Sequence, residues 1–267
     1  VLARGGGESL LRAGRRLDDL ADPLLFVLLN SQRVRVLIEK EARLGRFIHS
    51  RHVVRIVGEE DEGITLEHLS RHDAPPQRGE DLAAAGQHIA LLEQVGCQGL
   101  WLRLPRSADP QLKVYQDGVY REPAAGDCSL WAFGWQRFVP TRRPMPGLDE
   151  HLLAADPRPE LDEVSALTSA INDVARRDLG RTWSLAEVAV RLETSPRSLQ
   201  RGLAREGTRF SDVLERLRVQ EAQRLLRTTA LTVTEIGYVC GFADTSHFSR
   251  RFKRRVGCSP SRYRGGS

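Results

Sequence analysis

The spacing of hydrophobic positions changes along the chain, and its first half mixes helix and strand periods. Apolar residues recur every three or four positions across residues 8–29, which predicts a helix. Ser31 is placed to cap a second amphipathic helix that ends near Phe47. Residues 53–57 and 64–69 have strand composition on either side of an acidic turn, which predicts a hairpin.

The rest of this half continues the mixture. Residues 79–95 predict a helix, and strand-like stretches follow at 100–104, 112–115 and 129–139. Helices and strands in this irregular order predict an α+β domain. Five prolines between residues 140 and 159 then predict a linker or a surface strap. We therefore expect an α+β domain over residues 1–159 and a second domain over 160–267.

The second half has a helical pattern throughout, and two of its segments are copies of each other. Residues 183–188 and 231–236 each read apolar, Ser or Thr, two residues, Glu, apolar. This is a capping box inside a hydrophobic staple, in which hydroxyl and carboxylate cap free helix N–H groups. A second helix follows each copy, started by Ser195-Pro196 and by Asp244. Two helix pairs in tandem predict an all-α double helix-turn-helix.

Two further helices frame these motifs. Residues 161–178 predict a helix before the first motif, and residues 210–227 predict one between the motifs, with no Gly or Pro. The second is about 27 Å long at about 1.5 Å per residue. Successive major-groove faces of B-DNA lie about 34 Å apart. A rod of this length, with a helix pair at each end, predicts that both motifs contact one face of double-stranded DNA.

Charge is divided unevenly between the two halves. From Leu161 onward the sequence holds 19 Lys and Arg against 12 Asp and Glu, a net +7, whereas the preceding residues hold 21 against 23, a net −2. A basic half that also carries the helix repeat is typical of a polyanion-binding module. Basic charge alone would also fit a merely soluble surface, so it is the repeat that favours DNA.

The second motif resembles a known family signature. Residues 241–253 read GFADTSHFSRRFK and residues 257–264 read GCSPSRYR, and both strings are similar to the AraC/XylS family of transcriptional regulators. With the first motif and the spacer, the resemblance covers about residues 167–264. It implies a seven-helix DNA-binding domain with two motifs, attached to a regulatory domain. It also implies a cytoplasmic bacterial protein that contacts RNA polymerase and usually activates transcription.

The first half resembles the α+β effector domain of the family branch that contains ornithine-responsive and virulence-associated regulators. The strings that carry this resemblance are residues 71–76, 133–135 and 143–147. The early chain is helical, unlike the sugar-binding cupin type with its many short strands. The resemblance implies a small-molecule effector and regulation through homodimerisation or domain release. The effector-binding residues stay unassigned.

Helix periodicity selects the residues of the first motif that face DNA. Leu199 and Leu203 lie four residues apart and are expected in the core, so Arg197, Gln200 and Arg201 face outward. Arg suits bidentate contact with guanine, and Gln suits adenine. The matching positions contact bases in the resembled family. A solvated helix face is the alternative for these residues.

In the second motif Phe248 and Phe252 are expected to face inward. The residues predicted to contact bases are Thr245, Ser246, Ser249 and Arg250. Short hydroxyls discriminate bases weakly, so this motif is expected to depend more on DNA shape and phosphates. The predicted phosphate contacts are Arg251, Lys253, Arg254 and Arg262. Solubilising charge is the alternative for these four, as it is for Arg255 and Arg264.

Gly241 and Phe242 are predicted to serve the fold of the second motif. Gly241 follows Cys240 at a helix end, where glycine adopts the left-handed conformation without strain. Phe242 is then expected to fill the core of the motif.

Other chemistry has weaker support in the sequence. The four cysteines are widely spaced, which favours buried thiols in a reducing cytoplasm over disulfides or zinc. No apolar run reaches about 18 residues, so no membrane association is expected. His49 with His52, and His68 with His72, have metal-binding spacings, but no carboxylate pair is predicted to converge on them. No metal, cofactor or catalytic residue is predicted.

Three functions are weighed. The favoured one is an effector-modulated transcription activator. An architectural DNA binder without a ligand is disfavoured by the large α+β half. A DNA-repair enzyme fusion would need an N-terminal cysteine cluster and a Pro-Cys-His motif, and the sequence has neither. One basic run either receives an acidic effector or forms a solvated helix face: Arg33, Arg35, Lys40, Arg43, Arg46 and Arg51.

Overall fold

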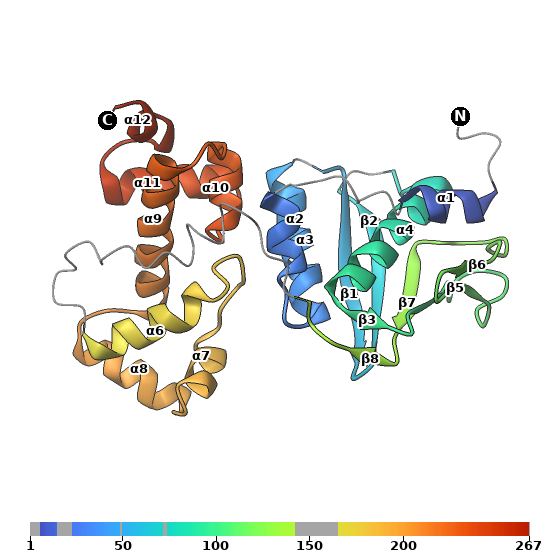
Figure 1. The fold of residues 1–267 in the computed structure, drawn as a ribbon, viewed down its shortest axis with the longest axis horizontal. Coiled ribbons are helices and arrows are strands. Elements are labelled where there is room, and N and C mark those ends of the chain that lie inside the picture. Colours follow the sequence, from blue (N-terminus) through green and yellow to red (C-terminus); the bar gives the residue numbers. More distant parts are fainter. Residues whose placement is uncertain (1–5, 15–22, 49, 72–73, 142–164, 267) are drawn as a thin grey trace. The chain divides into compact units, whose positions relative to one another are not determined.

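The computed structural model describes residues 6–14, 23–48, 50–71, 74–141 and 165–266 of the 267-residue chain. The chain divides into two compact units, Val1–Arg143 and Pro144–Ser267 (Figure 1). The first is α+β and the second is helical, as the hydrophobic pattern predicts. The predicted boundary at residue 159 lies within residues 142–164, outside the described residues, so the domain limits stay a prediction.

An antiparallel sheet forms the centre of the N-terminal unit. Its six strands follow the order β1 (His52–Glu60), β2 (Gly63–Ser70), β7 (Leu130–Gly134), β4 (Trp101–Arg103), β5 (Lys113–Gln116) and β6 (Val119–Tyr120). A small second sheet pairs β3 (Cys97–Gln98) with β8 (Arg137–Phe138). The predicted hairpin is confirmed, because β1 and β2 pair from His52↔Ser70 to Glu60↔Gly63.

Four described helices share a hydrophobic core with one face of this sheet. They are α1 (Gly7–Gly14), α2 (Pro23–Leu29), α3 (Val34–Phe47) and α4 (Arg78–Val95). Leu66 of β2 pairs with Trp131 of β7, so both side chains point to the same face. They are buried with Leu11, Leu37 and Ile89 of the helices. The predicted helix over 8–29 corresponds to α1 and α2, and residues 15–22 between them lie outside the described residues.

The start of α3 differs from the sequence interpretation, since Ser31 is not its cap. The Ser31 hydroxyl donates to the carbonyl oxygen of Leu28 at 2.7 Å and is buried there. Arg33 occupies the N-cap position without a side-chain hydrogen bond. Ser31 therefore closes the end of α2 rather than opening α3.

The predicted strand over 129–139 is divided between the two sheets. The backbone N–H of Trp135 donates to the carbonyl of Glu62 at 3.0 Å, and that of Gln136 donates to the carbonyl of Gln98 at 2.9 Å. These long-range bonds lead the chain from β7 to β8. A continuous apolar run cannot reveal such a change of partner.

The described residues of the C-terminal unit, 165–266, form seven helices. They are α6 (Ala166–Arg176), α7 (Leu185–Arg191), α8 (Pro196–Arg205), α9 (Phe210–Thr228), α10 (Val233–Val239), α11 (Thr245–Val256) and α12 (Pro260–Gly265). The helix predicted over residues 161–178 is confirmed as α6 in its described part, which begins after the N-cap residue Ser165.

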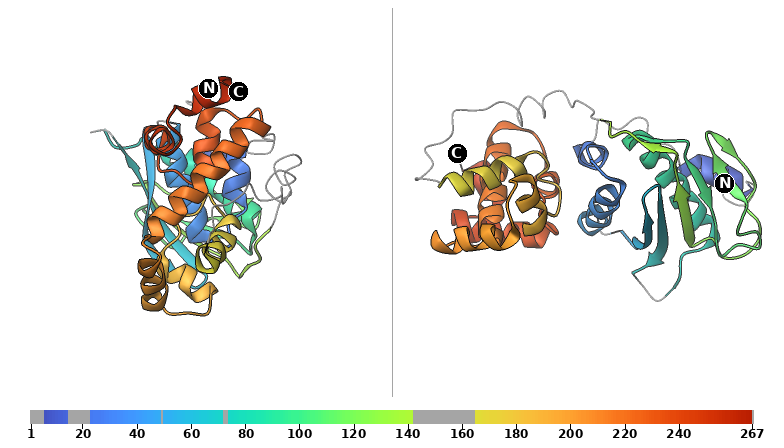
Figure 2. Two further views of the ribbon diagram at one scale, coloured as in Figure 1. Left: turned by 90° about the vertical axis from the view of Figure 1, so that its left-hand side faces the viewer. Right: turned by 90° about the horizontal axis from the view of Figure 1, so that it is seen from below.

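The predicted spacer is confirmed as α9, whose 19 residues measure about 28 Å at about 1.5 Å each. Its first half buries Val213 and Leu217 in a core with α6, α7 and α8. Its second half buries Leu225 and Leu226, and the helix as a whole also contacts α10, α11 and α12. One helix therefore belongs to the cores of both helix pairs, which lie at its opposite ends (Figures 1 and 2).

Candidate nucleic-acid interface

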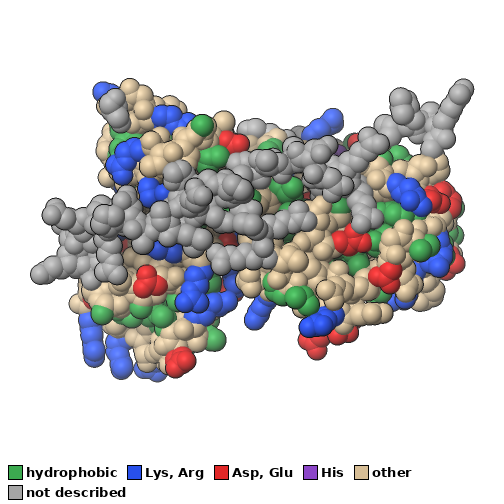
Figure 3. All heavy atoms as spheres, viewed as in Figure 1, with side chains coloured by type: hydrophobic (Ala, Val, Ile, Leu, Met, Phe, Trp, Pro, Cys, Tyr) green, Lys and Arg blue, Asp and Glu red, His purple; other side chains and the backbone are tan. Residues whose placement is uncertain are grey.

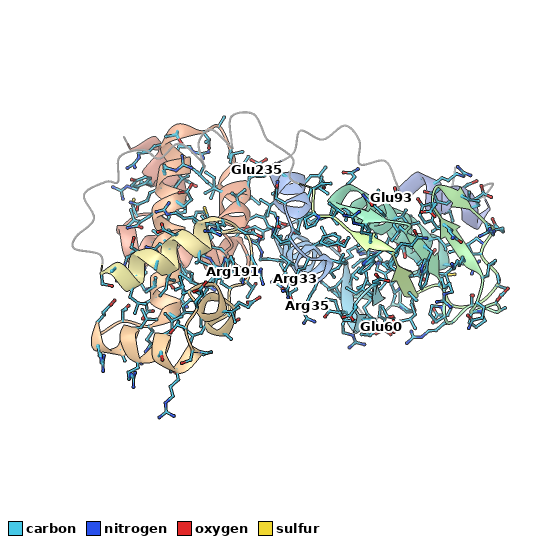
Figure 4. The ribbon with its side chains drawn as sticks, turned by 60° about the horizontal axis from the view of Figure 1, so that its bottom comes forward. Arg33, Arg35, Glu60, Glu93, Arg191 and Glu235 are labelled. Carbon is cyan, nitrogen blue, oxygen red and sulfur yellow. The ribbon has the colours of Figure 1, made fainter. Side chains whose placement is uncertain are left out.

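Both predicted capping boxes are present at the first helix of each motif. The Glu187 backbone N–H donates to the Ser184 hydroxyl at 3.2 Å, and the Ser184 N–H donates back to the Glu187 carboxylate at 3.0 Å. Thr232 and Glu235 make the same pair of bonds at the start of α10, where Figure 4 labels Glu235. These bonds satisfy helix N–H groups that would otherwise lack partners.

The second helix of each motif is also capped as predicted. The Ser195 hydroxyl accepts from the Ser198 N–H at 3.1 Å, and Pro196 occupies the first turn of α8. The Asp244 carboxylate accepts from the His247 N–H at 2.7 Å at the start of α11. The capped residue fixes where α8 and α11, the second helices of the two motifs, begin. Their starting points determine which of their side chains face outward.

On α8 the predicted outward residues are exposed. Leu199 and Leu203 are buried, whereas Arg197, Gln200 and Arg201 lie on the solvent side. Within the described part of the chain, the side chains of these three form no hydrogen bond or ion pair. Figure 3 shows Lys and Arg side chains projecting from the end of this unit where α8 lies.

Sequence reasoning missed one residue of this face. Arg205 is exposed and lies four residues after Arg201, so it continues the same stripe of α8. The four-residue spacing was the signal that could have identified it.

On α11 the predicted inward residues are confirmed. Phe248 and Phe252 are fully buried, with ring centroids 5.7 Å apart. Of the predicted base contacts, Ser246 and Arg250 are exposed, and Thr245 and Ser249 are partly buried. Lys253 and Arg262, predicted to contact phosphate, are both exposed.

The other basic residues of α11 have an acidic partner that the sequence did not indicate. Arg251 and Arg254, predicted phosphate contacts, both pair with Glu215 of α9, at 2.9 and 2.7 Å. Arg255 pairs with the same carboxylate at 3.2 Å. Arg264 donates to the carbonyl oxygen of Leu231, so this side chain stabilises the fold of the second motif.

The N-terminal unit contains a separate candidate site, a pocket between α3, α4 and the start of the β1–β2 hairpin. Its volume is about 170 Å³. Its polar lining residues are Glu41, Ser50, His52, His68, Gln87 and His88, and its apolar lining includes Ala42, Leu44 and Val54. Apolar and polar side chains both line this pocket, and its volume is smaller than the roughly 300–1,000 Å³ of most small-molecule sites.

The histidines of this pocket pair with carboxylates, contrary to the sequence interpretation. His68 Nδ1 lies 2.8 Å from Asp81 Oδ1, and His52 Nε2 lies 3.7 Å from Glu80 Oε1. Both carboxylates belong to α4. The spacing of the histidines in the sequence does not indicate that α4 lies beside them. His49 and His72 lie outside the described residues. Across the residues that the structure describes, no group of three or more His, Cys, Asp or Glu is arranged to hold a metal ion.

His88 is the most buried of these histidines, and it also pairs with a carboxylate. Its Nε2 lies 2.8 Å from Glu41 Oε2, and its Nδ1 lies 2.8 Å from the carbonyl oxygen of Ala84. Both partners accept hydrogen bonds, so both ring nitrogens carry protons. Burial disfavours the charged ring, but the Glu41 charge and hydrogen bond outweigh it and raise the pKa of His88.

The basic run on and around α3 is divided, because Arg33, Arg35, Arg46 and Arg51 are exposed as a solvated face would be, whereas Lys40 and Arg43 are buried. Lys40 is buried, and its ammonium group donates to the carbonyl oxygens of Val27 at 2.8 Å and Asn30 at 3.4 Å. A cation there satisfies carbonyls at the C-terminal end of α2. Arg43 is buried as well. Arg35, labelled in Figure 4, extends to Glu59 of β1 at 2.7 Å.

Comparison with known proteins identifies a domain in the C-terminal unit. A helix-turn-helix domain model matches residues 188–266. The ornithine utilization regulator of Pseudomonas aeruginosa is 42% identical over 104 residues, which are 39% of this chain and 31% of that protein. The uncharacterized HTH-type transcriptional regulator Rv1395 of Mycobacterium tuberculosis is 38% identical over 97 residues, which are 36% of this chain and 28% of that protein.

Among solved structures, the DNA-binding domain of AdpA in complex with a target DNA is 29% identical, with a TM-score of 0.34, and covers 38% of this chain and 93% of that chain. The chain spans about a third of the length of the two curated relatives.

Among the described helices, none is long and apolar enough to cross a membrane.

Proposed function

We propose that this chain, in which residues 188–266 form an AraC-type helix-turn-helix domain, is a sequence-specific DNA-binding regulator of transcription. The observation that carries the proposal is the pairing of α8 and α11. Each follows a capped first helix, starts at a capped residue and presents exposed polar side chains, and α9 joins their two cores. The relatives named as transcriptional regulators support the same role.

The two recognition helices are proposed to divide the work of DNA recognition. On α8, the free side chains of Arg197, Gln200 and Arg201 read bases in the major groove. On α11, the residues proposed to face bases are Thr245, Ser246, Ser249 and Arg250. Lys253 and Arg262 contact phosphates, which fixes the orientation of the domain without reading sequence.

The N-terminal unit is proposed to regulate this binding without catalysing a reaction. The pocket beside Glu41 and His88 supports a small effector, because apolar side chains and several polar groups converge on it. An effector acts only through its difference in affinity for two states of the protein, here states that differ in dimerisation or domain release. Contact with RNA polymerase and an activating role are proposed by resemblance to the family.

The test of DNA recognition is selection of bound sequences from randomised duplexes by the full-length protein. We expect one asymmetric consensus with two conserved segments about 10 base pairs apart. A triple variant, Arg197→Ala with Gln200→Ala and Arg201→Ala, should lose the segment read by α8. No enrichment with the wild-type protein would contradict the proposal.

The test of regulation is a reporter gene placed behind the selected sequence. Ala42→Phe fills the pocket of the N-terminal unit, and Asp173→Asn is a control on the surface of α6, in the other unit. Output from the wild type and the control should change with growth condition, whereas output from the pocket variant should not. Equal responses from all three proteins would contradict an effector in this pocket.

A further inference from the structure

A single carboxylate of the spacer helix binds three arginines of the second recognition helix. Glu215 Oε2 lies 2.9 Å from Arg251 Nη1, and Glu215 Oε1 lies 2.7 Å from Arg254 Nη2 and 3.2 Å from Arg255 Nε. The arginines occupy positions separated by three, one and four residues, so they share one side of α11. The contact joins α9 to α11 through residues that lie 36 to 40 positions apart in sequence.

The position of Glu215 distinguishes this cluster from an ordinary surface ion pair. Its side chain is only 13% exposed, whereas exposed pairs generally contribute little. Burial alone would raise the pKa of Glu215, but the guanidinium groups outweigh it and lower that pKa. The carboxylate therefore stays charged, and it is shared by donors that converge from one helix.

Two of the arginines have a second hydrogen-bond partner besides Glu215. Arg251 Nε also bonds His247 Nε2 at 3.2 Å. Arg255 Nη2 also donates to the carbonyl of Asp212 on α9 at 3.4 Å. Arg254 has the single bond to Glu215 and is 60% exposed, so it is the least restrained of the three.

The remaining cations of α11 are different. Within the described residues, the exposed side chains of Arg250 and Lys253 have no acidic partner. Glu215 therefore separates the basic residues of α11 into a held set and a free set. A cation held by a carboxylate is less available to a phosphate, because binding the phosphate requires it to leave or share that partner.

We propose that Glu215 is a specificity-determining residue, which holds Arg251, Arg254 and Arg255 on the spacer helix and so limits the sequence-independent attraction of α11 to DNA. This rests on the proposed DNA-binding function. Phosphate contacts raise affinity for every sequence alike. Holding three cations back leaves the choice of site to the residues that face the bases, and it fixes α11 against α9.

The experiment measures binding of the full-length protein to its selected duplex and to an unrelated duplex at several salt concentrations. The variants are Glu215→Gln and the matched control Asp173→Asn, which removes an exposed charge that pairs with no arginine in the described structure. Glu215→Gln should bind the unrelated duplex about tenfold more tightly, with a log–log salt slope steeper by about 0.9 for each arginine released. The ratio of specific to non-specific affinity should fall. Asp173→Asn should show neither change.

Paired substitutions keep the test decisive even where a variant loses stability. Lys253→Ala should reduce the salt slope by about 0.9 in the wild type. Arg255→Ala should leave the slope unchanged in the wild type and reduce it only when combined with Glu215→Gln. Equal effects of Arg255→Ala in both backgrounds, or unchanged non-specific affinity of Glu215→Gln, would overturn the inference. Failure of the wild type to prefer any sequence would instead overturn the proposed function.

Discussion

Gly241 lies so close to the carbonyl oxygen of Leu179 that a Cβ atom at this glycine would overlap that oxygen. Gly241 has φ of +80°, in the left-handed region that glycine adopts without strain. The close approach brings two segments together. One is the end of α10 in the second motif, and the other is the segment that joins α6 to the first motif. Phe242, the next residue, is 1% exposed and fills the core as predicted.

Gly241→Ala should therefore destabilise the C-terminal unit. The left-handed conformation costs a non-glycine residue about 1–3 kcal/mol, and relieving the overlap adds a similar amount. Chemical denaturation should show a loss of about 3 kcal/mol or more. Gly257→Ala is the matched comparison, because Gly257 also has positive φ (+89°) but has open space around it. Equal losses from the two substitutions would show that the contact with Leu179 is unimportant.

The His88–Glu41 pair predicts how the stability of the N-terminal unit depends on pH. The folded-state pKa of His88 is raised above its unfolded value of about 6.5. The stabilising contribution of His88 to the free energy of unfolding is therefore fully present below about pH 6.5. It is lost as the pH rises through the folded-state pKa. The difference in unfolding free energy between the wild type and His88→Gln should shrink over this range, by at most about 1.4 kcal/mol per pH unit.

Urea unfolding followed by tryptophan fluorescence can measure this difference, since Trp101, Trp131 and Trp135 all lie in the N-terminal unit. Comparison with His88→Gln removes the contribution of every other titrating group. A free-energy difference that stays constant from pH 6 to pH 9 would show that His88 is not charged in the folded state.

Arg201 and Lys253 should differ in what they contribute to DNA binding. Arg201→Ala should cost about 1–3 kcal/mol at the preferred site and relax specificity at one base position. Lys253→Ala should weaken binding to all sequences alike, because a phosphate contact carries no sequence information. Selection from randomised duplexes with each variant makes the comparison. An unchanged consensus with Arg201→Ala would show that the reading face of α8 is placed wrongly.

The sequence was sufficient for features that depend on near neighbours. Each capping box needs only a hydroxyl and a Glu three residues later, so Ser184 and Thr232 could be identified directly. The inward faces of α8 and α11 follow from four-residue spacing, as at Phe248 and Phe252. The helical spacing of apolar residues likewise predicted the spacer helix that is observed as α9.

Features that depend on distant partners were not predictable. Lys40 looks like a surface residue until the end of α2 supplies carbonyl oxygens for its ammonium group. Asp81 reaches His68 only because α4 packs on the sheet. Glu215 carried no local signal, since its arginine partners lie on another helix. Charges of this kind are decided by tertiary packing, which a periodic pattern does not record.

Hydroxyl-radical footprinting of the full-length protein on its selected duplex tests most directly whether both motifs bind one face of DNA. The geometry of α8 and α11 at opposite ends of α9 predicts two protected segments, centred about 10 base pairs apart on the same face of the helix. The segment assigned to α8 should lose protection in Arg197→Ala with Arg201→Ala, while the other segment remains. A single protected segment in the wild type would contradict the two-motif account.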